Sequence, residues 1–437
     1  METLLYVFGI LVMLVGLGLS IGLHEVGHLV PAKLFGVRVG QYMIGFGPRL
    51  WSKRFGETEY GFKALPLGGF ISMSGMYPPS RETRAAKGVF RTLVQDARSA
   101  NDETIAEGEE ARSFYRLPVW KRVIVMLGGP VMNLLLGILI FTILASGIGL
   151  SQGTTTIASV SECVLPAGST QTECGPDDPT APAAEAGILP GDELVSIDGE
   201  PIATFADASA IIRESPGETL SVVVERDGAQ QSLDLTPVAA ERQAVDANGA
   251  PVYDDEGQPV MQEVGYAGFG AQVAFVPQPI GTGTEMAFQQ AGAVASMIVT
   301  LPARLWDVGV ALFTDAERDP NGPLSVVGVG RLAGEVAATD APVLNRMVVL
   351  LNLLGALNIA LFVFNMIPLL PLDGGHIVVA LWDGVRRAWA KLRGKPAPAP
   401  VDATKLVPLT VVVAVVLIGM GALLLIADLF DPVSLFG

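Results

Sequence analysis

Charged residues are scarce in this chain of 437 residues. Only 16 % of the residues are charged and half are apolar, which excludes a single soluble globule and fits a membrane protein with soluble parts. Basic residues are fewer than acidic ones, with 28 Lys and Arg against 44 Asp and Glu. The resulting net charge of −16 argues against nucleic-acid binding. The length allows two or three domains.

Cysteine is also scarce. Cys163 and Cys174 lie in one polar stretch, where they form a small disulfide loop if that stretch is outside the cytoplasm and two unpaired thiols otherwise. A basic segment is missing before the first apolar run, where Glu2 stands instead. We therefore expect no cleavable signal peptide at this end.

Four stretches are long and apolar enough to cross a membrane, roughly Leu4–Leu29, Val123–Leu150, Val348–Leu370 and Leu406–Leu429. The loops 31–122 and 371–405 carry 15 and 6 Lys and Arg, whereas the long stretch 151–346 carries only 7. Because basic loops stay in the cytoplasm, we expect the first two loops there and the long acidic region outside, with both termini outside as well.

The first apolar run contains the motif HEVGH. His24 and His28 are four residues apart, so on a helix they share one face and can reach one metal ion, and Glu25 can take a proton from a water on that ion. The motif also arises by chance in long chains. No charge interrupts the run from Thr3 to Leu23, however, and ionisable residues inside a membrane span are functional candidates because they are costly to insert.

A catalytic zinc usually takes three protein ligands. The third histidine, His376, and a carboxylate, Asp373, both lie in NMIPLLPLDGGHI at the end of the third span. By the topology above, that end faces the same side as the HEVGH end of the first span. Pro368 and Pro371 break the helix there, which lets Asp373 turn inward. Alone the segment reads as a helix-ending turn; with the first motif at the same depth, it predicts a metal ligand.

Two regions between the spans predict β-structure. Residues 36–80 alternate apolar and polar positions around turn glycines, which indicates hairpins close to the membrane; an unpaired edge there can capture an extended peptide, and the alternative is an ordinary amphipathic hairpin. Residues 157–238 resemble a PDZ domain of the bacterial protease type, on Ala186-Gly187-Ile188, Gly191-Asp192 and Ile197-Asp198-Gly199. That resemblance implies a groove for a peptide or a free C-terminus, or else a steric filter.

The chain as a whole resembles the site-2 protease family of intramembrane zinc metalloproteases, in its bacterial RseP-like branch with a single PDZ domain. The matching segments are HEVGH, PLGGF, GPVMN, the PDZ domain, GPLSVVGV and NMIPLLPLDGG. The resemblance implies Zn²⁺ held by His24, His28 and Asp373, with Glu25 as general base and later proton donor. It implies that Asn365 holds the substrate strand or polarises the scissile carbonyl. The candidate substrate-binding residues are Gly68, Gly69, Phe70 and Asn133; no family role attaches to His376.

The expected fold is an α-helical polytopic membrane protein with four transmembrane helices, a membrane-associated β-hairpin region and an extracytoplasmic α+β PDZ domain. The expected segments are a first span (1–35), a hairpin region (36–80), a cytoplasmic connector (81–120), a second span (121–150), the PDZ domain (157–238), a linker with an amphipathic helix (240–345), a third span (346–376), a cytoplasmic loop (377–405) and a fourth span (406–430).

The family implies intramembrane hydrolysis of single-span proteins, such as an anti-sigma factor or remnant signal peptides. An upstream site-1 protease would first remove their bulky outside domain, and the enzyme would lie in the bacterial cytoplasmic (inner) membrane. Two alternatives are a metalloprotease of the HtpX or CAAX type, which needs a different third ligand, and a catalytically silent scaffold that holds a partner through the PDZ domain.

Overall fold

A computed structural model describes residues 2–78, 89–105, 108–165, 174–175, 178–244, 252, 258–314, 318–319 and 322–433. The chain forms two compact units. Met1–Gly147 and Pro279–Gly437 together make the first, here called the helical unit, and Ile148–Gln278 makes the second, the sheet unit.

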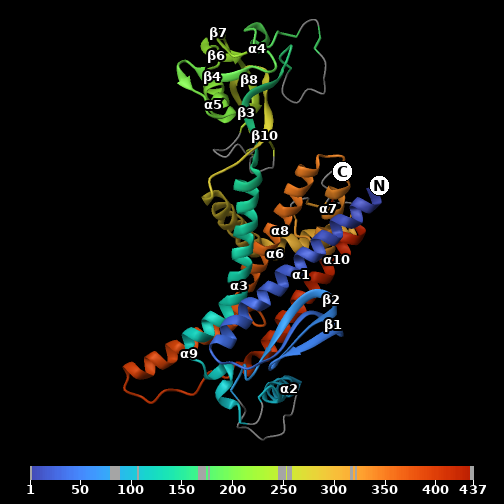
Figure 1. The fold of residues 1–437 in the computed structure, drawn as a ribbon, viewed down its shortest axis with the longest axis vertical. Helices are drawn as coiled ribbons and strands as arrows, with labels where there is room; N and C mark the ends of the chain where they lie inside the picture. Colours follow the sequence, from blue (N-terminus) through green and yellow to red (C-terminus); the bar gives the residue numbers. More distant parts are fainter. Residues whose placement is uncertain are drawn as a thin grey trace. The chain divides into compact units, whose positions relative to one another are not determined.

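The helical unit is built on long apolar helices (Figure 1). They are α1 (Glu2–Leu34), α3 (Val119–Thr142), α6 (Gly281–Phe313), α8 (Val343–Asn365) and α10 (Val407–Phe430). α3 continues into a π-helical turn, Ile143–Ile148. Five helices in the described part of the chain are thus long and apolar enough to cross a membrane, so the expected number of four is not confirmed.

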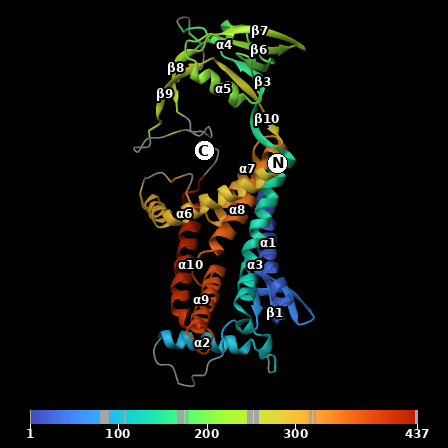
Figure 2. The same ribbon diagram turned by 90° about the vertical axis from the view of Figure 1, so that its left-hand side faces the viewer.

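The additional candidate is α6, which lies in the segment 240–345 expected to hold an amphipathic helix. The helix runs through Pro302 without ending and reaches 33 residues. It is the least hydrophobic of the five candidates, and it runs across the direction of the other long helices in both views (Figures 1 and 2).

The region expected to hold hairpins forms two bent strands, β1 (Val39–Phe55) and β2 (Thr58–Met73). The stretch Gln41–Ile44 of β1 lies between two stretches of β2, because Met43 pairs with both Gly61 and Phe70. The later stretch of β2 is therefore an edge of this small sheet. Beyond it lies the short helix α2 (Val89–Glu103), in the segment expected as a connector.

The third span is shorter than expected, and the loop after it is a helix. α8 ends at Asn365, and after a turn that contains Pro368 and Pro371 a separate helix α9 (Asp373–Leu392) begins. α8 ends before the expected boundary at 376, because Pro368 and Pro371 follow closely on one another and neither has an N–H to continue the helical hydrogen bonds. Most of the segment expected as a cytoplasmic loop, 377–405, belongs to α9, because apolar residues recur there at helical spacing between the charged ones.

Glycines set how closely the helices of this unit approach. A Cβ at Gly27 of α1 would lie 2.2 Å from the carbonyl oxygen of Gly128 in α3, so the two backbones are nearly in contact. Likewise a Cβ at Gly9 would lie 2.3 Å from the carbonyl oxygen of Ala333 in α7 (Val326–Ala338). The small-residue stretch Gly322–Arg331 thus leads into a helix that packs directly on α1.

The sheet unit contains a six-stranded sheet. Five strands follow the order β10-β3-β4-β6-β7, and the short β5 pairs with β4. The strands are β3 (Leu150–Val160), β4 (Glu193–Ile197), β5 (Glu200–Pro201), β6 (Leu220–Arg226), β7 (Ala229–Leu235) and β10 (Phe269–Val276), with the helices α4 (Pro182–Glu185) and α5 (Phe205–Glu214). A separate hairpin pairs β8 (Val238–Gln243) with β9 (Met261–Tyr266).

The expected domain, 157–238, was too short at both ends. β10 pairs along β3 from Phe269 with Val160 to Val276 with Leu150, so the sheet needs residues on both sides of the expected boundaries. The segment from 240 that was expected as a linker instead contributes to three short strands, β8, β9 and β10. Its polar, glycine-rich composition gave no clear strand pattern. Cys163 and Cys174 form a disulfide here.

Candidate metal centre

Three ligand atoms from distant parts of the helical unit meet at one point. The Nε2 atoms of His24 and His28 are 3.2 Å apart, and Asp373 Oδ2 lies 3.3 Å from each of them. Bonds of about 2.0–2.1 Å to a tetrahedral zinc place neighbouring ligand atoms about 3.3–3.4 Å apart. The triangle therefore has the size of one face of a zinc tetrahedron.

The protonation of the groups that form this triangle also favours a bound cation. His28 Nδ1 lies 2.7 Å from the carbonyl oxygen of Val125, an acceptor, so Nδ1 carries the proton of the neutral ring. Its Nε2 then presents a lone pair to Asp373 Oδ2, a buried oxygen for which the structure gives no hydrogen-bond donor. Lone pairs that converge repel unless a positive ion lies between them, so these residues fit a bound zinc.

Helix geometry explains why the ligands come so close. His24 and His28 are one helical turn apart on α1, and Asp373 is the first residue of α9. α3 passes behind them with Gly129, where a Cβ would lie only 2.2 Å from His28 Nε2 and 2.7 Å from His24 Nε2. Only a residue without a side chain leaves room here for both imidazoles.

Glu25 lies beside the ligands on a cavity of about 300 Å³. The residue is only 8 % exposed, and a Cβ at Gly69 of β2 would lie 2.9 Å from its Cγ, so the strand passes directly against it. The cavity wall holds all three ligands and is completed by Gly69, Phe70, Ile71, Met73, Met76, Met126, Asn365, Pro371 and His376.

Two of the expected substrate-binding residues lie elsewhere. Asn133 is 1 % exposed and does not line the cavity; its amide lies 3.1 Å from His24 Nδ1, behind the ligand. Gly68 does not line the cavity either, and a Cβ there would collide with the ring of Phe46. Of the four residues expected to bind substrate, Gly69 and Phe70 line the cavity and these two do not. The sequence gives the neighbourhood of a residue but not the direction in which its side chain faces.

Asn365 reaches the cavity, but its Nδ2 donates to the carbonyl of Leu361 on its own helix, at 2.9 Å. His376, to which the sequence assigned no role, also lines the cavity, and its ring stacks on Tyr77 at 6.3 Å between centroids. Its position three residues after Asp373, one helical turn, was the available signal.

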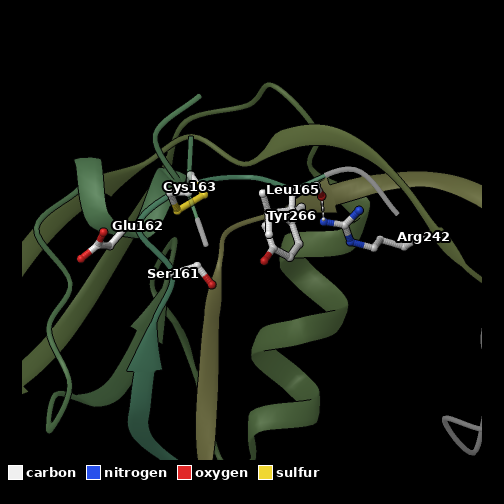
Figure 3. Close-up of a pocket in the computed structure, with 7 residues that line it drawn as sticks. Ser161, Glu162, Cys163, Leu165, Arg242 and Tyr266 are labelled. Carbon is white, nitrogen blue, oxygen red and sulfur yellow. Dashed lines mark hydrogen bonds between the residues drawn. A yellow bond between two sulfur atoms is a disulfide. The ribbon is translucent and has the colours of Figure 1, made fainter. Parts of the chain in front are cut away.

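The sheet unit has two adjoining cavities. One, of about 550 Å³, is lined by Ser161, Glu162, Cys163, Leu165, Cys174, Arg242 and Tyr266 (Figure 3). The other, of about 360 Å³, is bounded by α5 and the segment Val264–Phe269. Arg242 lines both, with its guanidinium 4.3 Å from the ring of Tyr266 and one N–H donated to the carbonyl of Leu165.

Comparison with known proteins agrees with the ligand geometry. Residues 12–408 match the model of peptidase family M50. The chain is 33 % identical to the zinc metalloprotease Rip1 of Mycobacterium tuberculosis over 99 % of this chain and 100 % of that protein. It is 34 % identical to Rip1 of Mycolicibacterium smegmatis, over 98 % of this chain and 99 % of that one.

A putative zinc metalloprotease of Rhizobium meliloti is 29 % identical over 88 % of both chains. The matches cover the helices that carry both halves of the ligand set, and the named relatives are zinc enzymes. The chain therefore belongs to peptidase family M50 and is a zinc metalloprotease with helices that can cross a membrane.

Proposed function

We propose that this protein hydrolyses peptide bonds within transmembrane segments of single-span proteins. The observation that carries the proposal is the ligand triangle, 3.2–3.3 Å on each side, formed by an apolar 33-residue helix and the helix that follows another apolar span. In this reading His24, His28 and Asp373 hold zinc, and Glu25 is the general base. When bound, zinc polarises a carbonyl and makes water acidic enough to lose a proton near neutral pH.

The protein's own residues handle the protons. Glu25 takes a proton from the attacking water and later gives it to the leaving amine, and its partial burial keeps competing water away from the carboxylate. Asn365 is at the cavity wall, where rotation of its amide away from Leu361 would let Nδ2 donate to the substrate carbonyl. In that role Asn365 would stabilise the negative charge that develops on the oxygen.

The β2 edge gives a reason why a helical substrate could be cut. A helix hides its carbonyls in internal hydrogen bonds, so it must unwind before hydrolysis. The stretch of β2 that begins at Gly69 pairs with β1 on one side only within the described residues, and it lies against Glu25. An unwound substrate that adds to this edge as a strand would present its carbonyls to the cavity.

The substrates we propose are anti-sigma-factor-like proteins or remnant signal peptides, trimmed first by a site-1 protease. The proposed location is the bacterial cytoplasmic membrane, with the basic loops inside and the sheet unit outside. In the sheet unit, the cavity bounded by α5 and the segment Val264–Phe269 is our candidate for the groove of a PDZ domain. Buried N–H groups of Arg213 and Gln243 lack acceptors among the described residues there, which suits a peptide carboxylate.

The test is cleavage of a transmembrane peptide by the full-length protein purified in detergent, with zinc content measured on the same samples. Glu25→Gln is expected to keep zinc and to lose activity by at least about 100-fold, the usual contribution of a general base. Asp373→Ala is expected to lose zinc as well. A Glu25→Gln variant that cleaves at the parent's rate would refute the role of Glu25, and Asp373→Ala with full zinc would refute that of Asp373.

A further inference from the structure

The helix α9 has an apolar face that nothing in the described structure covers. Its opposite face is fixed to α3, because Asp383 is fully buried and pairs with Arg122 of α3. The outward face carries large apolar side chains, each between 46 % and 82 % exposed, namely Val378, Leu381, Trp382, Val385, Trp389 and Leu392. α9 is not among the helices apolar enough to cross a membrane, so this face needs a different apolar environment.

Basic side chains follow the tryptophans at a regular interval. Arg386 stands four residues after Trp382, and Arg393 stands four residues after Trp389, so each tryptophan has an arginine one turn further along the same face. The Arg393 guanidinium lies 4.4 Å from the ring of Trp389. Neither arginine forms an ion pair with an acidic residue that the structure describes, so both charges are available to an external anion.

The side of α9 opposite this face lies against the start of α3, a helix long and apolar enough to cross a membrane. A Cβ at Gly384 would lie 3.3 Å from Val119, the first residue of α3, and Trp120 beside it is 57 % exposed. At the other end, α9 begins only eight residues after α8 ends. Figure 1 shows α9 projecting sideways beside the start of α3. Tryptophan and arginine side chains near the ends of membrane-spanning helices are typical of the boundary between acyl chains and headgroups.

We propose that the outer face of α9 binds the anionic headgroup layer of the bilayer. In this arrangement the apolar side chains and both tryptophans enter the acyl boundary, while Arg386 and Arg393 reach lipid phosphates. The occupant is a phospholipid surface and not a protein, because the basic residues flank the apolar face as an interfacial helix requires. The helix so anchored is the one whose first residue is Asp373.

The experiment uses the full-length protein in vesicles of phosphatidylcholine mixed with phosphatidylglycerol, with bromine on the acyl chains of one lipid at a time. Bromine quenches nearby tryptophan, and the part due to α9 is the difference between the parent and a Trp382→Phe/Trp389→Phe variant. We expect this part to be quenched more by brominated phosphatidylglycerol than by brominated phosphatidylcholine.

Arg386→Gln/Arg393→Gln is expected to lower the preference for phosphatidylglycerol by about five-fold for each arginine. Arg386→Lys/Arg393→Lys keeps both charges and is the matched control, expected to retain most of the preference. The proposal is overturned if neither lipid quenches Trp382 and Trp389, as when a second copy or a soluble protein covers the face, or if the glutamine variant keeps the parent's preference.

Discussion

At the scale of single residues, the absence of a side chain at Gly129 matters as much as the ligands themselves. The ligand atoms fill the space where a Cβ of residue 129 would lie, 2.2 Å from His28 Nε2. Contacts of that length force one group to move, and the rigid backbone of α3 leaves the imidazole as the group that yields. The metal centre thus depends on α3 although α3 supplies no ligand.

Gly129→Ala is expected to lower zinc occupancy of the purified protein strongly, since it pushes both imidazoles out of the ligand triangle. Gly18→Ala on α1 is the matched control, because a Cβ there has no atom within 4 Å and the helix should form equally well. Metal analysis of both variants checks this. Equal zinc content in the two would show that the imidazoles have room to shift.

Asn133 holds His24 from behind, at 3.1 Å from Nδ1. With Nε2 on zinc, Nδ1 carries the ring proton, so the Asn133 amide, whose Nδ2 faces Nδ1 here, would turn over to accept that proton on its oxygen. Asn133→Ala is expected to weaken zinc binding by about 10- to 100-fold, and Asn133→Asp, which keeps an acceptor, by less. Competition with a zinc chelator measures both, and identical affinities for parent and alanine variant would contradict the orienting role.

At the scale of elements, a buried carboxylate joins α10 to the start of α7. Asp428 is 2 % exposed, lies 2.7 Å from Arg318 and accepts a hydrogen bond from the backbone of Ser325, the residue that caps α7. Asp428→Ala leaves the Arg318 charge buried without this partner and is expected to destabilise the protein by about 3–5 kcal/mol. Thermal unfolding in detergent tests this, with the exposed Asp340→Ala as control; equal midpoints would argue against it.

In the sheet unit, Asp192 ties β4 to β6. Arg226 donates to both of its oxygens, at 2.7 and 2.8 Å, and this pairing holds the pKa of Asp192 below its ordinary value. A lowered carboxyl pKa stabilises the fold above the unfolded pKa of about 4, and that contribution is lost as the pH falls through the folded value. We expect urea pulse proteolysis of the full chain to show the parent losing its advantage over Asp192→Asn below about pH 4. A constant difference down to pH 2 would contradict this.

The elements that the sequence predicted were those with a strong local period. The helix α5 (Phe205–Glu214) is an example, since Thr204 and Asp207 form a capping box at its start and its apolar residues recur at helical spacing. β10 could not be predicted as part of the same sheet, because its pairing with β3 joins residues more than a hundred positions apart. α9 was missed for a different reason. Its large apolar side chains are exposed, so an amphipathic helix is favoured there only if lipid or a partner covers them.

At the scale of the whole molecule, the meeting of His24, His28 and Asp373 could be predicted because the expected topology brings their two motifs to one depth. What the sequence could not give was which neighbouring side chains face the cavity. Asn133 turned to the back of His24, Asn365 bonded to its own helix, and His376 entered the cavity wall. Those orientations follow from helix rotation and close glycine packing, which a single sequence does not encode in any local pattern.

The account depends most on His24, His28 and Asp373 binding one zinc together. X-ray absorption at the zinc edge of the full-length protein measures this directly. We expect two imidazole nitrogens and a carboxylate oxygen at about 2.0–2.2 Å, with the oxygen lost or the metal released in Asp373→Ala. A spectrum with only one imidazole, or one left unchanged by Asp373→Ala, would contradict the account.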